Sequence, residues 1–287
     1  MTTQLRALLE LGRVSNLPSV VTNVLAAWIL TGTGFGLGLV GLVLGAMCLY
    51  LGGTTLNDAV DVQFDREHRP ERPIPAGIFS VRQVWAIGIG YLVIGSGLLL
   101  GLTKAAPLWI GALVASIVIY DIVHKKWKGA VFVMGSCRLF LYLVAASAAT
   151  GGHGLNLLVL IWAAAIFLYI VGLTLIARGE STGGGVPPVS FGFLGAPVVA
   201  GAISLAFEGG GVVFAICMLA FMGWVGVCLW RLKGGDPARI GRFVGGLLAG
   251  IPLIDALAIA SLVPWLALVF LLALPSSVAL QRVVAAT

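Results

Sequence analysis

Long apolar runs alternate with short polar or glycine-containing stretches along the whole chain. The runs cover residues 16–33, 38–56, 82–102, 107–123, 130–150, 156–177, 189–207, 210–230, 243–262 and 264–282. A helix needs about 20 apolar residues to cross the hydrocarbon layer of a bilayer. The pattern therefore predicts an all-α protein, a polytopic transmembrane helix bundle of nine or ten spans. The last two runs leave the number open, because Asp255 lies within one and Pro264 and Pro275 interrupt the other.

The composition supports a membrane protein. Hydrophobic residues make up 60% of the chain and charged residues 10%, whereas soluble domains are about 25% charged. We interpret residues 1–287 as a single integral membrane domain. The first residues are polar and carry Arg6, Glu10 and Arg13, and the apolar run that follows has no cleavage-like end. We therefore expect no removable signal peptide.

The cysteines give no sign of metal or redox chemistry. All four lie within apolar runs and form no C-x-x-C pair: Cys48, Cys137, Cys217 and Cys228. Such placement predicts buried thiols.

The basic residues of the loops fall on one side of the predicted membrane if the spans alternate in direction. That side holds Arg6, Arg13, Arg66, Arg69, Arg72, Arg82, Lys125, Lys126, Lys128, Arg178, Arg231, Lys233, Arg239, Arg242 and Arg282, and the other side holds Lys104. Short cytoplasmic loops are enriched in Lys and Arg. We therefore expect a multi-pass protein with its N-terminus and these loops in the cytoplasm, in the inner membrane if the source is bacterial. The net charge of +6 then reports topology, and we expect no nucleic-acid partner.

Carboxylates cluster at the end of the second run, in Asn57-Asp58-x-x-Asp61-x-x-x-Asp65. Spaced three and four residues apart, the aspartates would form one stripe on a helix. Like charges repel, and each aspartate within the hydrocarbon costs about 2.5–3.5 kcal/mol. A divalent cation that prefers oxygen ligands, such as Mg²⁺, would offset this cost. The alternative is a solvated helix end beyond the membrane, where carboxylates cost little.

Cations near this cluster favour the metal interpretation. The following segment contains Arg66, His68, Arg69 and Arg72-Pro73-Ile74-Pro75-Ala76-Gly77, and the fourth run ends in Tyr120-Asp121 followed by Lys125 and Lys126. Basic residues beside metal-binding carboxylates suit a diphosphate, because cations and metal share its negative charge.

These motifs resemble the first signature of the UbiA superfamily of intramembrane prenyltransferases. The match lies in Asn57 to Arg66 and in Arg72 to Gly77, with Arg13 and the stretch from Tyr120 to Lys126 also similar. The resemblance covers nearly the whole chain in segment order, with a first motif loop at 57–81 and a second at 177–189. It implies a helix bundle that encloses a central cavity and opens sideways to membrane lipid. It also implies Mg²⁺-dependent transfer of an isoprenyl group from an isoprenyl diphosphate to a lipophilic acceptor, which we expect to be aromatic.

The resemblance also implies residue roles. The expected metal ligands are Asn57, Asp58, Asp61, Asp65 and Glu180, and the expected catalytic carboxylates are Asp58, Asp61 and Asp65. The expected diphosphate contacts are Asn57, Arg13, Arg66, Arg72, Lys125, Lys126 and Arg178, and Asn23 and Tyr120 are expected to line the cavity. For each cation, the alternative is that it contributes to topology alone.

The chain departs from the family pattern at the second motif. Where the family carries D-x-x-x-D or a close variant, this chain has Ala177-Arg178-Gly179-Glu180. Only Glu180 is suited to ligate a metal there, so we expect one Mg²⁺ site and leave a second open. A weak repeat between 53–61 and 172–180 would place Glu180 opposite Asp61.

Two ionisable residues lie well inside predicted spans. An intramembrane arginine is a functional candidate by default, so we assign Arg138 a catalytic role toward the diphosphate or the acceptor. Pairing with Asp255 and snorkelling to the interface are the alternatives. Asp255 either forms a structural pair or lines the cavity, and Asn23 either lines the cavity or bonds a neighbouring helix.

Two other functions fit part of the pattern. A UbiA-type terpene cyclase or diphosphate-lyase would use the same first motif without an acceptor pocket. A membrane transporter would use Asp255 and Arg138 as coupling groups, but a carrier has no evident use for a metal-binding stripe at the membrane face.

Overall fold

The computed structural model describes residues 2–152, 155–182, 187–232 and 237–284, with the backbone alone at 179–182, 232 and 237–240. All regular structure in these ranges is helical. The elements are α1 Thr3–Leu11, the 3₁₀ turn η1 Val14–Asn16, α2 Leu17–Ile29, α3 Gly38–Val60, α4 Val62–His68, α5 Val81–Leu102, α6 Pro107–Val123, α7 Ala130–Ala149, α8 Leu157–Thr182, α9 Val189–Leu194, α10 Ala196–Glu208, α11 Val212–Leu232, α12 Pro237–Ala249, α13 Ile251–Ile259, α14 Pro264–Leu271 and α15 Ala273–Gln281.

The predicted all-α bundle is confirmed. Within the described residues, eight helical segments are long and apolar enough to cross a membrane, and the shorter apolar segments Val14–Ile29 and Pro107–Val123 complete the predicted order. Helices satisfy every backbone group within one segment, which is what a span in lipid requires. Several segments are two helices in line, with breaks at Gly195, Gly250 and Leu272.

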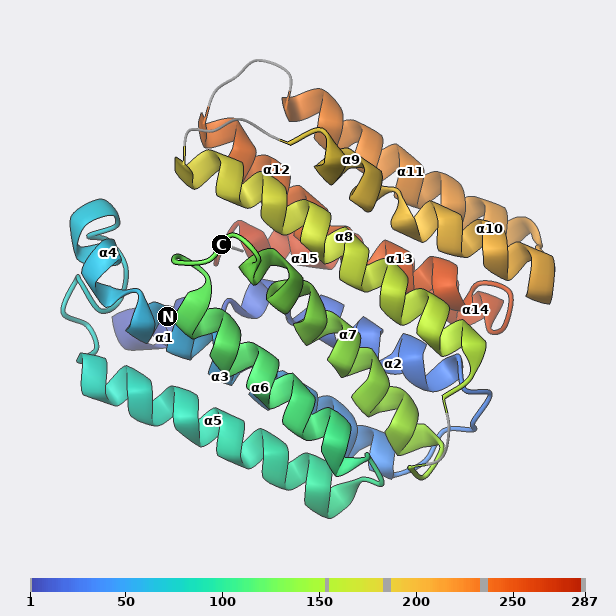
Figure 1. Ribbon diagram of the computed structural model, residues 1–287, viewed down its shortest axis with the longest axis horizontal. Coiled ribbons are helices and arrows are strands. Elements are labelled where there is room, and N and C mark those ends of the chain that lie inside the picture. The colour runs from blue at the N-terminus through green and yellow to red at the C-terminus, as the bar shows by residue number, and fades with distance from the viewer. Residues whose placement is uncertain (1, 153–154, 183–186, 233–236, 285–287) are drawn as a thin grey trace.

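The helices run roughly antiparallel to their neighbours in one elongated bundle (Figure 1). α5 packs on α3, α6 on α7, and α7 on α8, while α2 contacts both α7 and α13. The ends of α3, α6 and α8 lie together with α4 and the start of α7, at the left of Figure 1. We call this the motif end of the bundle. The antiparallel order brings the predicted first motif and the residues after α6 to the same end.

Small residues set the close approach of α3 and α5. A Cβ atom added at Gly95 would lie 2.8 Å from the carbonyl oxygen of Gly45, and one at Gly88 would lie 2.6 Å from a methyl carbon of Leu56. Without a hydrophobic driving force between helices in lipid, such close backbone packing is a main source of helix association.

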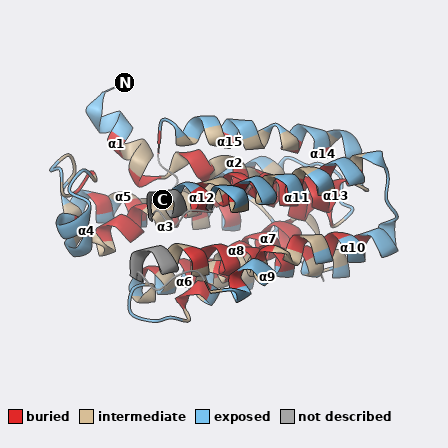
Figure 2. Cartoon of the chain, turned by 90° about the horizontal axis from the view of Figure 1, so that it is seen from above, coloured by how far each residue is buried: buried red, intermediate tan, exposed pale blue. Residues whose placement is uncertain are grey.

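Buried positions face the bundle axis, and exposed ones cover its outside (Figure 2). The largest fully buried side chains include Trp162, Tyr142 and Tyr169. The Trp162 indole donates to Ser204 Oγ at 3.0 Å and the Tyr169 hydroxyl donates to the Leu247 carbonyl at 2.9 Å. The outer faces carry many exposed large apolar side chains, as a surface in contact with lipid tails would.

A polar network ties α2, α7 and α13 together inside the bundle. Asp255 is fully buried and accepts hydrogen bonds from Thr22 Oγ1 at 2.6 Å, Asn23 Nδ2 at 2.7 Å and the Tyr142 hydroxyl. The Asn23 Oδ1 in turn accepts from Arg138 Nη1 at 2.7 Å. Arg138 and Asp255 are therefore linked through Asn23, and no direct ion pair joins them in the described part of the chain.

Candidate active site

The loop after the first motif is anchored by its own residues. Ile74 is buried against Leu11, Ala59 and Val84, and the amide of Ala76 donates to the Arg72 carbonyl at 2.9 Å. These contacts hold the Arg72 backbone close to the end of α3. The two prolines of the Arg72–Gly77 segment favour such a fixed turn.

The first motif spans a helix junction. Asp61 closes α3 and precedes α4, with φ −83° and ψ 1°. The three aspartates therefore do not form the single stripe predicted for one continuous helix. Asp61 and Asp65 line the cavity described below, whereas Asp58 is not among its lining residues.

Asp58 is enclosed by two arginines. Its Oδ1 lies 2.6 Å from Arg72 Nη1 and 3.1 Å from Arg13 Nη2. Arg13 also donates to Asn57 Oδ1 at 3.1 Å. Among the described residues, Arg13 is the one non-glycine residue with a positive φ, 42°. This backbone state is uncommon outside glycine and clusters at functional sites. Asp58, an expected metal ligand, holds Arg13 and Arg72 here through one carboxylate oxygen.

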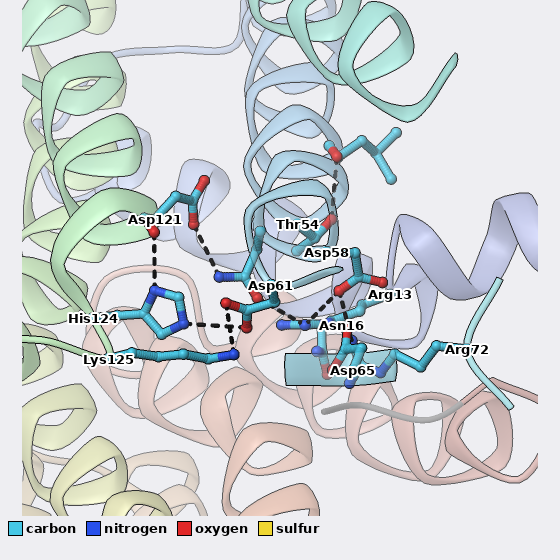
Figure 3. A network of polar contacts seen from close by, with 12 residues as sticks. Arg13, Asn16, Thr54, Asp58, Asp61, Asp65, Arg72, Asp121, His124 and Lys125 are labelled. Atoms are coloured by element: carbon cyan, nitrogen blue, oxygen red, sulfur yellow. Dashed lines mark hydrogen bonds and ion pairs between the residues drawn. The ribbon is translucent and has the colours of Figure 1, made fainter. Parts of the chain in front are cut away.

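Asp61 faces cations from the end of α6. Its Oδ1 lies 2.8 Å from Lys125 Nζ and its Oδ2 lies 3.2 Å from His124 Nε2, as Figure 3 shows. His124 Nδ1 lies 3.2 and 3.1 Å from the carbonyls of Tyr120 and Asp121. Because both ring nitrogens face acceptors, the doubly protonated imidazolium fits this geometry.

The charged groups of this cluster shift one another's pKa values. Burial works to raise the pKa of Asp61, but the hydrogen bonds from His124 and Lys125 outweigh it, so the pKa of Asp61 is lowered. Burial works to lower the pKa of His124, and its contact with Asp61 reverses the sign, so the pKa of His124 is raised. Burial raises the pKa of Asp65, because Arg72, at 4.0 Å, compensates only in part.

A cavity of about 620 Å³ runs from this cluster into the bundle. Its polar lining is concentrated in Arg13, Asn16, Asn57, Asp61, Asp65, Arg69, Arg72, Tyr120, Asp121, His124, Lys125 and Arg178. Its apolar lining includes Leu49, Leu113, Ile117, Leu141, Ile170 and Leu173. The cavity therefore has a charged region at the motif end and a largely apolar interior, which also holds Arg138. Such a space suits a ligand with an anionic head and a hydrocarbon tail.

Arg178 lines the cavity and also supports the turn between α6 and α7. Its Nη1 donates to the carbonyls of His124 at 2.9 Å and Trp127 at 2.8 Å. This residue, which stands where the second motif is expected, thus holds the segment that carries Lys125. The side chain of Glu180, the other expected contributor, lies outside the described residues.

Arg138 lines the cavity from α7. It donates to Asn23 and to the Ser19 carbonyl and hydroxyl, and its guanidinium carbon lies 5.7 Å from the centre of the Tyr50 ring. Tyr50 is seven residues before Asn57 on α3, which corresponds to about 10 Å along the helix. Arg138 therefore lies deeper in the cavity than the Asp61 cluster.

Three further residues expected at the site lie outside this cavity lining. Asn23 does not line the cavity, because it is fully buried in the network of Asp255. Arg66 and Lys126 are exposed and are not among the lining residues. Neighbouring residues take their places, since Arg69 and His124 line the cavity.

Comparison with known families decides the assignment. The profile of the UbiA prenyltransferase family matches residues 19–251. The chain belongs to the UbiA prenyltransferase family. Within this UbiA family member, the matched range contains the first motif, the α6–α7 turn and Arg178, so the family signature and the cavity occupy the same part of the chain.

Known relatives agree with this placement. Digeranylgeranylglyceryl phosphate synthase of Methanopyrus kandleri is 30% identical over 144 residues, which are 47% of this chain and 52% of the relative. The chain thus matches about half the length of this curated relative. An apo UbiA homologue of Aeropyrum pernix K1 has a TM-score of 0.68 at 19% identity, covering 86% of this chain and 98% of that one. An Archaeoglobus fulgidus UbiA homologue bound to DMAPP and Mg²⁺ has a TM-score of 0.54 at 16% identity, covering 89% and 99%. At these identities the two structures show a shared fold.

The donor set of this UbiA family member fits Mg²⁺. Within the described residues, no three His, Cys, Asp or Glu side chains converge as a complete metal site. Mg²⁺ needs no such cage, since it is usually bound by one or two carboxylates together with substrate phosphates. Asp61, Asp65 and Asp121 line the cavity. The Oδ2 atom of Asp121 is buried without a hydrogen-bond partner among the described residues. Hard, anionic oxygens facing a cavity are suitable ligands for this ion.

Three charged cavity residues were not predicted from the sequence: Arg69, Asp121 and His124. The sequence did contain a signal for Asp121 and His124. Asp121 is four residues before the predicted contact Lys125, and His124 lies between them at the end of a helix. For Arg69 the sequence contained no distinguishing signal, since Arg66 and Arg69 are neighbours in one short helical stretch.

Proposed function

We propose that this chain transfers an isoprenyl group from an isoprenyl diphosphate to a lipophilic acceptor within the membrane, with Mg²⁺. The observation that carries the proposal is the cluster of carboxylates and cations, centred on Asp61 and Lys125, at one end of a cavity with an apolar interior. We also propose that the motif end faces the cytoplasm, because the basic loops gather there.

The donor head would lie among the cations. Arg13, Arg69, Arg72 and Lys125 all line the cavity at the motif end, where guanidinium and ammonium groups donate to phosphate oxygens. Asp61 and Asp65 would hold Mg²⁺, which when bound neutralises charge that develops on the leaving diphosphate.

The transfer itself would use the two halves of the cavity together. The bond between C1 of the isoprenyl group and the diphosphate oxygen breaks, and its electron pair leaves with the diphosphate. The acceptor supplies an electron pair to C1 and loses a proton. Leu49, Leu113 and Ile117, from α3 and α6, line the interior and exclude water from the allylic cation.

Two acceptor classes are candidates. The first is a lipophilic aromatic molecule, as the sequence favours. The second is an isoprenoid glyceryl phosphate, because the curated relatives are named digeranylgeranylglyceryl phosphate synthases.

The test is an assay of the purified protein in lipid nanodiscs. Dimethylallyl, geranyl and geranylgeranyl diphosphate are each supplied with Mg²⁺, alone and with an aromatic or a glyceryl phosphate acceptor. Released diphosphate and the mass of the lipid product are followed. Prenylated acceptor is the expected product, and Asp61→Asn is expected to abolish it. Glu208→Gln, an exposed carboxylate at the end of α10, is the matched control.

The same assay identifies the competing functions. Diphosphate release without an acceptor, together with a new hydrocarbon or alcohol, would indicate a cyclase or lyase in place of a transferase. Absence of any release in the wild type, with solute flux into vesicles, would indicate a transporter and overturn the proposal.

A further inference from the structure

Asp121 is a buried carboxylate that faces the cavity near the end of α6. Only 5% of the residue is exposed, and it is among the lining residues. Its Oδ1 accepts from Asn57 Nδ2 at 3.1 Å. Its Oδ2 has no hydrogen-bond partner in the described part of the chain. The first motif therefore holds one oxygen, and the other is buried without a hydrogen-bond partner among the described residues.

The other carboxylates of the lining have cationic partners. Asp61 is 2.8 Å from Lys125, and Asp65 is 4.0 Å from Arg72. No Lys, Arg or His among the described residues lies within ion-pair distance of Asp121. Arg13 and His124 act on Asp121 only from beyond that distance. Because burial of a carboxylate without a close ion pair is costly, the charge of Asp121 is compensated only in part. A cation from outside the protein would complete the compensation.

The position of Asp121 suits a cation shared with the first motif. Asn57 and Asp61 are four residues apart on α3, and the amide of Asp61 donates to the Asn57 carbonyl at 3.0 Å. Because Asn57 Nδ2 donates to Asp121 Oδ1, the Asp121 carboxylate lies beside the turn of α3 that ends at Asp61. Two carboxylates in one cavity lining, completed by phosphate oxygens and water, match the usual ligand set of Mg²⁺.

The residue at the second motif has a different role here. Arg178 donates to the carbonyls of His124 and Trp127, which lie just beyond Asp121 in the chain. This guanidinium holds the end of α6 and brings no carboxylate. The end of α6 is thus fixed in place from α8, with Asp121 in the cavity lining.

We propose that Asp121 is a Mg²⁺ ligand of this site, which supplies from α6 a carboxylate that the chain lacks at Arg178. The assignment rests on the proposed function, because the ion binds together with the diphosphate. The metal site of this chain would then be formed by residues of α3, α4 and α6.

Metal binding without turnover provides the test. Mn²⁺, followed by electron paramagnetic resonance, is titrated into the full-length protein in nanodiscs in the presence of inorganic pyrophosphate. Asp121→Asn keeps the volume and an acceptor for Asn57 but removes the charge. We expect it to weaken Mn²⁺ binding by about tenfold or more, which corresponds to about 1.4 kcal/mol. Glu208→Gln is the matched control and should bind as the wild type.

Asp61→Asn separates this inference from the proposed function. If Asp61→Asn weakens Mn²⁺ binding and Asp121→Asn does not, Asp121 is not a ligand and the metal–diphosphate site stands without it. If neither variant changes Mn²⁺ binding, the proposed site fails as a whole.

A ligand swap distinguishes a metal ligand from a residue that only positions Asn57. Asp121→Cys introduces a thiolate, which prefers Cd²⁺ to Mn²⁺. We expect Cd²⁺ affinity to rise at least tenfold over the wild type, measured in parallel because Cys137 also lines the cavity. Unchanged Cd²⁺ affinity would overturn the assignment. This variant also decides the question if Asp121→Asn does not fold, as judged by size-exclusion chromatography.

Discussion

Arg72 Nη1 lies 2.6 Å from Asp58 Oδ1, and this ion pair joins the loop after α4 to the end of α3. The same oxygen is 3.1 Å from Arg13 Nη2, so one carboxylate holds arginines from two separate segments. Both arginines also line the cavity. Asp58 thus places two cations where an anionic head would bind, without facing the cavity itself.

Replacing Asp58 by Asn should release this pair of arginines. Breaking a buried ion pair costs about 3–5 kcal/mol, and we expect the lower end, because Arg13 retains its bond to Asn57. Thermal unfolding in nanodiscs should shift to lower temperature, and pyrophosphate should bind at least fivefold more weakly. The control is Glu10→Gln, which alters an exposed pair with Arg6. Unaltered pyrophosphate affinity would show that Asp58 does not position the arginines.

Arg178→Met should loosen the turn after α6. The substitution keeps an extended side chain but removes the donors to His124 and Trp127. Hydrogen exchange at residues 124–128 should accelerate, and the KM for the isoprenyl diphosphate should rise more than kcat falls. Arg231→Met, an exposed arginine at the end of α11, serves as the control. Weaker binding with unchanged exchange would instead make Arg178 a direct diphosphate contact.

Asp255→Leu should destabilise the bundle strongly. Three hydrogen bonds to Asp255 would be lost, and buried polar groups on α2 and α7 would be left without a partner, at about 1–3 kcal/mol each. The half-life of folded protein at fixed temperature, followed by size-exclusion chromatography, should fall sharply. The half-life of Asp255→Asn, which retains an acceptor oxygen, should fall less. Equal half-lives for Asp255→Leu and the wild type would show that the network contributes nothing to stability.

Gly95→Ala should separate α3 from α5. The added Cβ would be 2.8 Å from the Gly45 carbonyl oxygen and 3.0 Å from Cys48 Cβ, so backbone must move, at about 1–3 kcal/mol. Gly90→Ala, where nothing lies within 4 Å of the added carbon, is the matched control and should be neutral or slightly stabilising, because Ala favours helix by about 1 kcal/mol. Thermal unfolding of both variants is the measurement. A Gly95→Ala protein as stable as Gly90→Ala would contradict close packing at this contact.

The amino-acid sequence alone determined the class, the order of the spans and the location of the first motif. Runs of about 20 apolar residues must be helical in lipid, because no other open structure satisfies the backbone there. The Asn57–Asp65 cluster and the Arg72–Gly77 loop were readable because their spacing is local. The place of Lys125 beside this cluster was also predictable, because alternating spans bring the end of α6 to the end of α3.

Tertiary structure decided which members of each cluster face the cavity. Asp58, on the last turn of α3, meets arginines from two other segments, and no count along one helix predicts those partners. Arg69, at the end of α4, lines the cavity, whereas Arg66 does not. Asn23 and Asp121 are both buried polar side chains on predicted spans. Asn23 joins a satisfied network, whereas Asp121 lies in the cavity lining with one buried oxygen that has no partner among the described residues. Only contacts between distant segments separate the two cases, because the partners of Asn23 and Asp121 come from other helices.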